Sequence, residues 1–76
     1  MDVFESVKKI IINELNCKPE KVTMDSKLKD DLGADSIDAV QIVMDIEDEY
    51  GITIDEDVAE QMITVGDVVK YIEDNK

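Results

Sequence analysis

The amino-acid sequence predicts an all-α protein, a small bundle of three main helices plus one short helix. In three segments apolar residues recur every three or four positions, as in an amphipathic helix, and capping residues, glycine or proline separate these segments. The run from Ile52 to Ile54 could form a strand, but no second strand-like run is present to pair with it. At 76 residues the chain is predicted to form a single domain, residues 1–76, with a thin aliphatic core.

The N-terminal segment carries the first predicted helix. Its apolar residues share one helical face, and they are Val3, Phe4, Val7, Ile10, Ile11 and Leu15. Asp2, with Glu5 three residues later, resembles a capping box, and Asn16 through Pro19 end the helix. Beyond this point apolar residues are scattered among polar ones without either periodicity. We therefore expect a long connection pinned by three side chains, those of Val22, Leu28 and Leu32.

The second and longest helix is predicted from Ser36 to Tyr50. Gly33 breaks the chain before it and Asp35 can cap its first turn. The run itself contains neither glycine nor proline, and Gly51 follows it where a helix commonly ends.

Two further helices are predicted after a connecting loop at Ile52–Ile54. The first is short, from about Glu56 to Met62. The second begins near Thr64 and Asp67, which offer another N-terminal cap. The apolar face of this last helix consists of Val65, Val68, Val69 and Ile72.

The chain is strongly acidic. Twenty acidic residues against eight basic ones give a formal charge of −12, and such a surface repels phosphate backbones and anionic lipid headgroups. We therefore expect neither nucleic-acid partners nor stable membrane insertion. The charge alone is compatible both with simple solubility and with a partner that carries a basic patch. Without a signal-like or membrane-spanning run near the N-terminus, a cytoplasmic protein is expected.

The sequence contains few of the residues that catalysis or metal binding requires. The chain has no histidine, so the ordinary Ser-His and Cys-His nucleophile systems cannot form, and its single cysteine, Cys17, is expected to be inert. Asp45, Glu47 and Glu49 fall at the first, third and fifth places of an EF-hand-like loop, but the required sixth-position glycine would be Tyr50. We predict an interaction module that is not an enzyme and has no metal site.

The helix from Ser36 to Tyr50 has two apolar faces when its residues are placed at about 100° steps. One face is the expected core face, formed by Ala39, Ile42, Val43, Ile46 and Tyr50. The other is a second stripe formed by Ile37, Val40 and Met44, flanked by four acidic residues, Asp38, Asp45, Glu47 and Asp48. Periodicity alone leaves two interpretations open: a central helix buried on both sides, or an exposed contact surface rimmed by charge.

The segment Asp31-Leu32-Gly33-Ala34-Asp35-Ser36-Ile37-Asp38, followed by Val40, Val43 and Met44, resembles the phosphopantetheine attachment signature of acyl carrier proteins. It is most similar to the carriers of bacterial fatty acid synthesis, in which the enzymes are separate chains. The resemblance continues through the acidic residues and aromatic at Glu47–Tyr50, then Ile52–Ile54, Ala59-Glu60 and Ile63-Thr64-Val65, so it covers nearly the whole chain. By itself an Asp-Ser dipeptide would indicate only a helix start. The departures from the family pattern are Ile37 for Leu, Gln41 for Glu and Asp55 for Pro.

The resemblance implies a function and a set of partners. Ser36 would accept 4′-phosphopantetheine from coenzyme A through a magnesium-dependent transferase, the holo-acyl-carrier-protein synthase, and the thiol of the arm would hold acyl chains as thioesters. Further partners would be malonyl transacylase, ketoacyl synthases, reductases, dehydratases and acyltransferases. They would contact a monomeric carrier through Asp35, Ile37, Asp38, Val40, Met44, Glu47 and Asp48.

Two other functions remain open from the sequence. A carrier for D-alanyl, polyketide or aminoacyl groups would use the same serine. From a different class, a non-covalent acidic module that binds partners or divalent ions would leave Ser36 unmodified.

Overall fold

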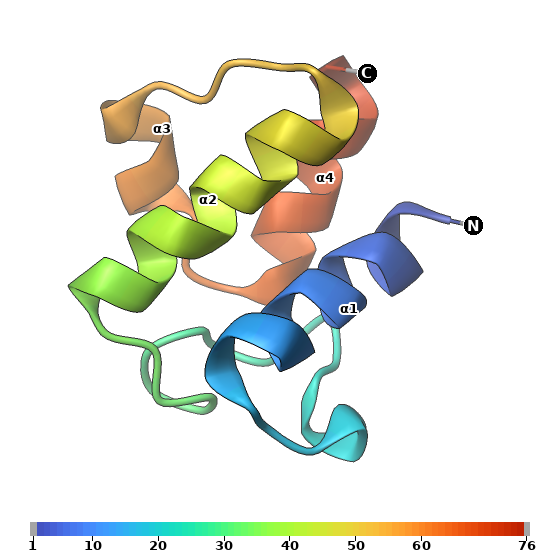
Figure 1. Ribbon diagram of the computed structural model, residues 1–76, viewed down its shortest axis with the longest axis vertical. Coiled ribbons are helices and arrows are strands. Elements are labelled where there is room, and N and C mark those ends of the chain that lie inside the picture. Colours follow the sequence, from blue (N-terminus) through green and yellow to red (C-terminus); the bar gives the residue numbers. More distant parts are fainter. Residues whose placement is uncertain (1, 76) are drawn as a thin grey trace.

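The structure is a computed structural model that describes residues 2–75 (Figure 1). It contains four α-helices within these residues: α1 (Val3–Leu15), α2 (Ser36–Tyr50), α3 (Glu56–Gln61) and α4 (Val65–Asn75). The prediction of an all-α bundle with three main helices and one short helix is confirmed. Among the helices described, none combines the length and apolar character needed to cross a membrane.

Helices α1, α2 and α4 enclose the core. Helix α1 packs against both α2 and α4, which together cover its apolar face (Figure 1). The side chains with the lowest exposure come from all three helices, and they are Val7, Ile11, Ile42, Ile46, Val65, Val68 and Ile72. Each of these residues lies on a face predicted from helical periodicity. Aliphatic packing of the kind expected from the composition therefore holds the bundle together.

The termini of α1 follow the predicted signals with one difference. The Asp2 carboxylate accepts a hydrogen bond from the Glu5 backbone N–H at 2.8 Å, which is one half of the capping box that the sequence resembles. At the other end Asn16 adopts a left-handed conformation with φ of 56°, and its N–H donates to the Ile12 carbonyl. The helix therefore stops at Leu15, where the punctuating residues begin.

The long connection between α1 and α2 is anchored as predicted, with Val22 and Leu28 buried and Leu32 half-buried. It also contains a 3-10 turn, Pro19–Lys21, that the sequence analysis did not predict. The buried Ser26 hydroxyl donates to the Lys21 carbonyl at 2.7 Å and accepts from the Thr23 N–H at 3.0 Å. These hydrogen bonds hold the turn to the residues that follow it.

The same connection is bound to the beginning of α4. The Val65 N–H donates to the Ser26 carbonyl at 2.9 Å, and the Gly66 N–H donates to the Met24 carbonyl at 2.8 Å. A Cβ atom on Gly66 would lie 2.9 Å from that carbonyl oxygen, so a residue without a side chain is needed at this contact. The connection is thus held against the bundle at its centre.

The segment after α2 is a loop, as predicted. Gly51 ends α2 with φ of 65°, and Ile54 is the buried residue of the loop. Within residues 2–75 there is no strand, only an isolated bridge between Lys27 and Thr64. Helix α3 ends at Gln61, one residue earlier than predicted, because Met62 has φ and ψ of −85° and 91°, outside the helical region.

Candidate functional site

Ser36 is the first residue of α2, and its side chain is exposed. Gly33 adopts a positive φ of 76°, and the chain then turns into a complete capping box. The Asp35 carboxylate accepts from the Asp38 N–H at 2.8 Å, while the Asp38 carboxylate accepts from the Asp35 N–H at 3.4 Å. The predicted cap at Asp35 is confirmed, and it places the Ser36 hydroxyl in the first turn of the helix.

The backbone before Ser36 is fixed to the connection. Ala34 is buried, and its N–H donates to the Leu28 carbonyl at 2.9 Å. Leu28 is itself buried, and its N–H donates to the Ile63 carbonyl at 3.0 Å. Ser36 therefore begins α2 from a position fixed beside the connection, which is itself bound to Ile63 in the segment before α4.

The second apolar stripe of α2, which we call the apolar strip, is exposed. The exposed fractions of its side chains are 78% for Ile37, 59% for Val40 and 50% for Met44. On the core face, by contrast, Ile42 and Ile46 are buried, and the other members are half-buried. Of the two interpretations left open by periodicity, burial on both sides is therefore wrong: the stripe is exposed, and its role as a contact surface stays a prediction.

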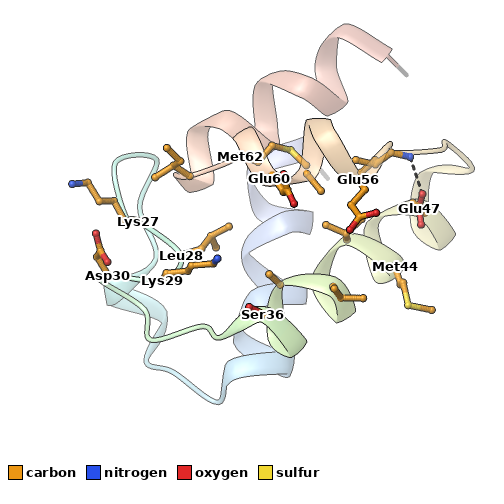
Figure 2. A pocket seen from close by; sticks show the side chains of 16 residues that line it. Lys27, Leu28, Lys29, Asp30, Ser36, Met44, Glu47, Glu56, Glu60 and Met62 are labelled. Carbon is orange, nitrogen blue, oxygen red and sulfur yellow. Dashed lines mark hydrogen bonds between the residues drawn. The ribbon is translucent and has the colours of Figure 1, made fainter.

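A cleft of about 780 Å³ lies between α2, α3 and the connection, and Ser36 is one of its lining residues (Figure 2). Most of its walls are apolar, formed by Leu28, Ala39, Val40, Val43, Met44, Ile54, Ala59, Met62 and Ile63. No pattern in the sequence predicts this cleft, because its lining residues come from segments far apart in the chain. Its volume and apolar lining are typical of a site for a small ligand.

The acidic residues named from the sequence have different environments. Asp48 is exposed and Asp38 is half-buried in the capping box. The Glu47 carboxylate instead accepts a hydrogen bond from the Ile54 N–H at 2.7 Å through one oxygen, as Figure 2 shows. Glu47 therefore ties α2 to the loop before α3, a structural role that the sequence analysis missed.

The calcium-loop alternative does not fit the observed backbone. Asp45, Glu47 and Glu49 all lie within the regular helix α2, where residues two positions apart point to nearly opposite sides. In residues 2–75 no group of three carboxylate, cysteine or histidine side chains is placed to hold a metal ion. An EF-hand needs a sharply turning loop, which this segment does not form.

Known proteins with a similar sequence and fold belong to one family. The family model described as the phosphopantetheine attachment site matches residues 5–72. The chain is 47% identical over 76 residues to an acyl carrier protein of Wolinella succinogenes, with complete coverage of both chains. It is 46% identical over 76 residues to an acyl carrier protein of Helicobacter acinonychis, covering 97% of that relative. A solved acyl carrier protein structure from Enterococcus faecalis is 40% identical, with a TM-score of 0.84 and complete coverage of both chains.

Together with the helical fold, the match to this family model defines the class: a protein that carries a prosthetic group. The chain belongs to the phosphopantetheine-attachment family. The predicted resemblance to acyl carrier proteins is confirmed over the whole chain. The carrier class and the phosphopantetheine cofactor predicted from the sequence are confirmed with it.

Proposed function

We propose that the protein carries acyl chains for fatty acid synthesis, and that Ser36 is the residue to which its phosphopantetheine arm is attached. The observation that carries this proposal is the position of Ser36, exposed in the first turn of α2 and at the edge of an apolar cleft. Its sequence surroundings supply the second support, because Asp35-Ser36 lies within the attachment signature that the chain resembles.

The proposed loading step uses the Ser36 hydroxyl as the nucleophile. Its Oγ attacks the phosphorus atom of coenzyme A that carries the pantetheine, and an Oγ–P bond forms. The bond from that phosphorus to the rest of the nucleotide breaks, adenosine 3′,5′-bisphosphate leaves, and a base of the transferase takes the hydroxyl proton. The resulting phosphodiester anion would lie at the N-terminus of α2, where backbone N–H groups and the helix dipole favour negative charge.

The arm supplies a terminal thiol that holds an acyl group as a thioester. The cleft next to Ser36 fits such cargo, because its walls are mainly aliphatic side chains from α2, α3 and the connection (Figure 2). Each buried methylene group of a bound chain would contribute about 0.8 kcal/mol. A cargo of aliphatic chains matches this lining better than amino acids, whose charged amino group would be desolvated there.

Partner enzymes would approach the exposed apolar strip. Asp35, Asp38, Glu47 and Asp48 lie along the same helix or at its start, and they would meet basic patches on the partners. One Glu47 oxygen is engaged by Ile54, which leaves the second oxygen for a partner. The charge of −12 would raise encounter rates, and a contact area of a few side chains would keep release fast.

These partners are proposed to be the phosphopantetheinyl transferase, malonyl transacylase, ketoacyl synthases, reductases, dehydratases and acyltransferases. We further propose that the chain acts as one domain and as a monomer in the cytoplasm. The two terminal residues of the proposed domain 1–76 lie outside the described residues.

Intact mass after incubation with coenzyme A, magnesium and a phosphopantetheinyl transferase tests the attachment site. We expect the wild type to gain the mass of one phosphopantetheine and Ser36→Ala to gain none. Ser6→Ala, which removes another serine hydroxyl on a different helix, is the matched control and should load normally. Loading of Ser36→Ala, or no loading of the wild type by an active transferase, would refute the proposal.

A binding measurement tests the apolar strip. Met44→Ala should weaken binding to the transferase about 5- to 10-fold, as loss of a central apolar contact typically does. Met24→Ala is the control, because Met24 has a similar exposed fraction, 45% against 50%, but lies in the connection instead of α2. Equal effects of the two variants would remove the argument for docking at the strip.

A further inference from the structure

The charges around the cleft beside Ser36 are unevenly distributed. Two lysines, Lys27 and Lys29, line it on the side of the connection, although basic residues are the minority in this chain. One acidic residue, Asp30, also lines the side of the connection, whereas three glutamates, Glu47, Glu56 and Glu60, line the side of α2 and α3 (Figure 2). An anion at the mouth of the cleft would therefore be attracted toward the connection and repelled from the opposite wall.

The two lysines are not equivalent. In Figure 2 the ammonium group of Lys29 is directed into the cleft, toward the start of α2 where Ser36 lies. The ammonium group of Lys27 is directed outward, on the side where Asp30 lies. Only Lys29 of this pair is thus oriented toward a group attached to the Ser36 hydroxyl.

A backbone hydrogen bond joins the segment that carries Lys29 to the segment that leads into Ser36. The Leu28 carbonyl accepts from the Ala34 N–H at 2.9 Å, which joins the residue before Lys29 to the residue two positions before Ser36. Both Leu28 and Ala34 are buried. The position of the lysine beside the serine is consequently set by the core, whereas its side chain keeps the freedom to follow a ligand.

We propose that Lys29 is a positioning residue for the prosthetic group: its ammonium group pairs with the phosphodiester anion on Ser36 and holds the first part of the arm on the connection side of the cleft. This inference rests on the proposed attachment at Ser36. Asp35 and Asp38 flank the serine, but their carboxylates accept each other's backbone N–H groups in the capping box. Of the two lysines that line the cleft, Lys29 is the one whose ammonium group is directed at the anion.

The pairing predicts a spectroscopic difference between the apo and holo proteins. Loading is first verified by intact mass. The ε-methylene cross-peaks of the lysines are then compared by NMR in both forms, and Lys29 should shift at least about twice as far as Lys27, since electrostatic effects fall with distance. Raising the sodium chloride concentration to about 1 M, where the screening length is about 3 Å, should reduce this difference.

A matched pair of variants provides the second measurement. In the holo protein, Lys29→Gln should sharpen the phosphorus-31 line of the phosphodiester, because the arm becomes more mobile, whereas Lys27→Gln should leave the line close to that of the wild type. Both positions are exposed, so the fold should survive either change. Failure to load would refute the attachment at Ser36 and this inference together. Normal loading with equal shifts for both lysines, or equal effects of both variants, would refute the role of Lys29 alone.

Discussion

Asp67 shows how much one side chain contributes to the start of a helix. Its carboxylate accepts hydrogen bonds from the Thr64 and Ile63 backbone N–H groups, both at 3.1 Å, while the Thr64 hydroxyl accepts from the Asp67 N–H. The hydrogen bond from the Thr64 N–H is the largest cause that lowers the pKa of Asp67 below its ordinary value of 3.8. Burial opposes it, while the hydrogen bonds with the Ile63 N–H and the Thr64 side chain and the charge of Lys70 lower the pKa further.

This lowered pKa predicts a pH dependence of stability. Because the folded state prefers the ionised carboxylate, its contribution is complete above pH 3.8 and is lost as the pH falls through the lower folded-state pKa. Asp67→Ala should reduce the free energy of unfolding by about 1 kcal/mol at pH 7. In urea titrations this difference from the wild type should shrink below pH 3.8 and disappear at the lowest pH. Glu73→Ala, an exposed change on the same helix, is the control. A difference that stays constant down to that pH would contradict the assignment.

For single residues, the sequence predicted those roles that depend on neighbours a few positions away in the chain. The caps at Asp35 and Thr64–Asp67 depend on residues three positions apart, so a short window reveals them. The roles of Glu47 and Lys29 depend on a loop that returns to α2 and on a connection packed beside it. No periodicity or motif carries that information, because these contacts are made only when the elements assemble.

Among the α-helices of residues 2–75, α3 is the shortest and has the fewest stabilising features of its own. It is six residues long, it has no buried residue, and no side-chain hydrogen bond caps its N-terminus at Asp55. A helix of this length is not stable by itself in water. The hydrogen bond from Ile54 to Glu47, just before α3, is therefore one of the contacts that hold this wall of the cleft against α2.

Removing that hydrogen bond should loosen α3 without unfolding the bundle. Glu47→Ala is expected to speed amide hydrogen exchange at Ile54 by about tenfold or more, because a hydrogen bond to a charged group contributes about 1.5–3 kcal/mol. Exchange at the buried residues of α1 should change little. The matched control is Glu49→Ala, which removes a carboxylate from the exposed side of the same helix. Equal exchange in both variants would show that the contact does not restrain α3.

The positions of the helices were predictable because the residues that form their apolar faces and caps lie within short stretches of the sequence. The bounds of α2 agree with the prediction at both ends, where a capping box and a glycine mark them. The short helix was predicted one residue too long, since no sequence signal distinguishes Gln61 from Met62. The 3-10 turn at Pro19–Lys21 was missed because the hydrogen bond from the Ser26 hydroxyl to the Lys21 carbonyl lies within an irregular segment. The cleft could not be predicted at all, since it exists only between elements.

Over the whole molecule, the acidic charge opposes folding. A formal charge of −12 is held within a radius of gyration of 10.9 Å, and like charges at such separations repel one another in dilute buffer. At an ionic strength of about 0.15 M the screening length is about 8 Å, so added salt reduces much of this repulsion.

The melting temperature should consequently rise with salt. A gain of about 1 kcal/mol would raise it by about 4–8 °C for a chain of this size. Calorimetry in increasing sodium chloride, repeated with magnesium chloride at equal ionic strength, measures the effect and separates screening from magnesium binding. A melting temperature that stays flat or falls with salt would show that self-repulsion does not limit stability.

The exposed apolar strip also has a colloidal consequence. Exposed apolar side chains such as those of Ile37, Val40 and Met44 also favour contact between two copies of the chain. At neutral pH the repulsion between two strongly negative copies keeps them apart, so the net charge opposes self-association. Near the isoelectric point of about 4.1 that repulsion vanishes while the strip remains. Light scattering should therefore detect self-association in a narrow pH range around the isoelectric point. Met44→Lys should narrow that range further, because it places a cation on the apolar strip.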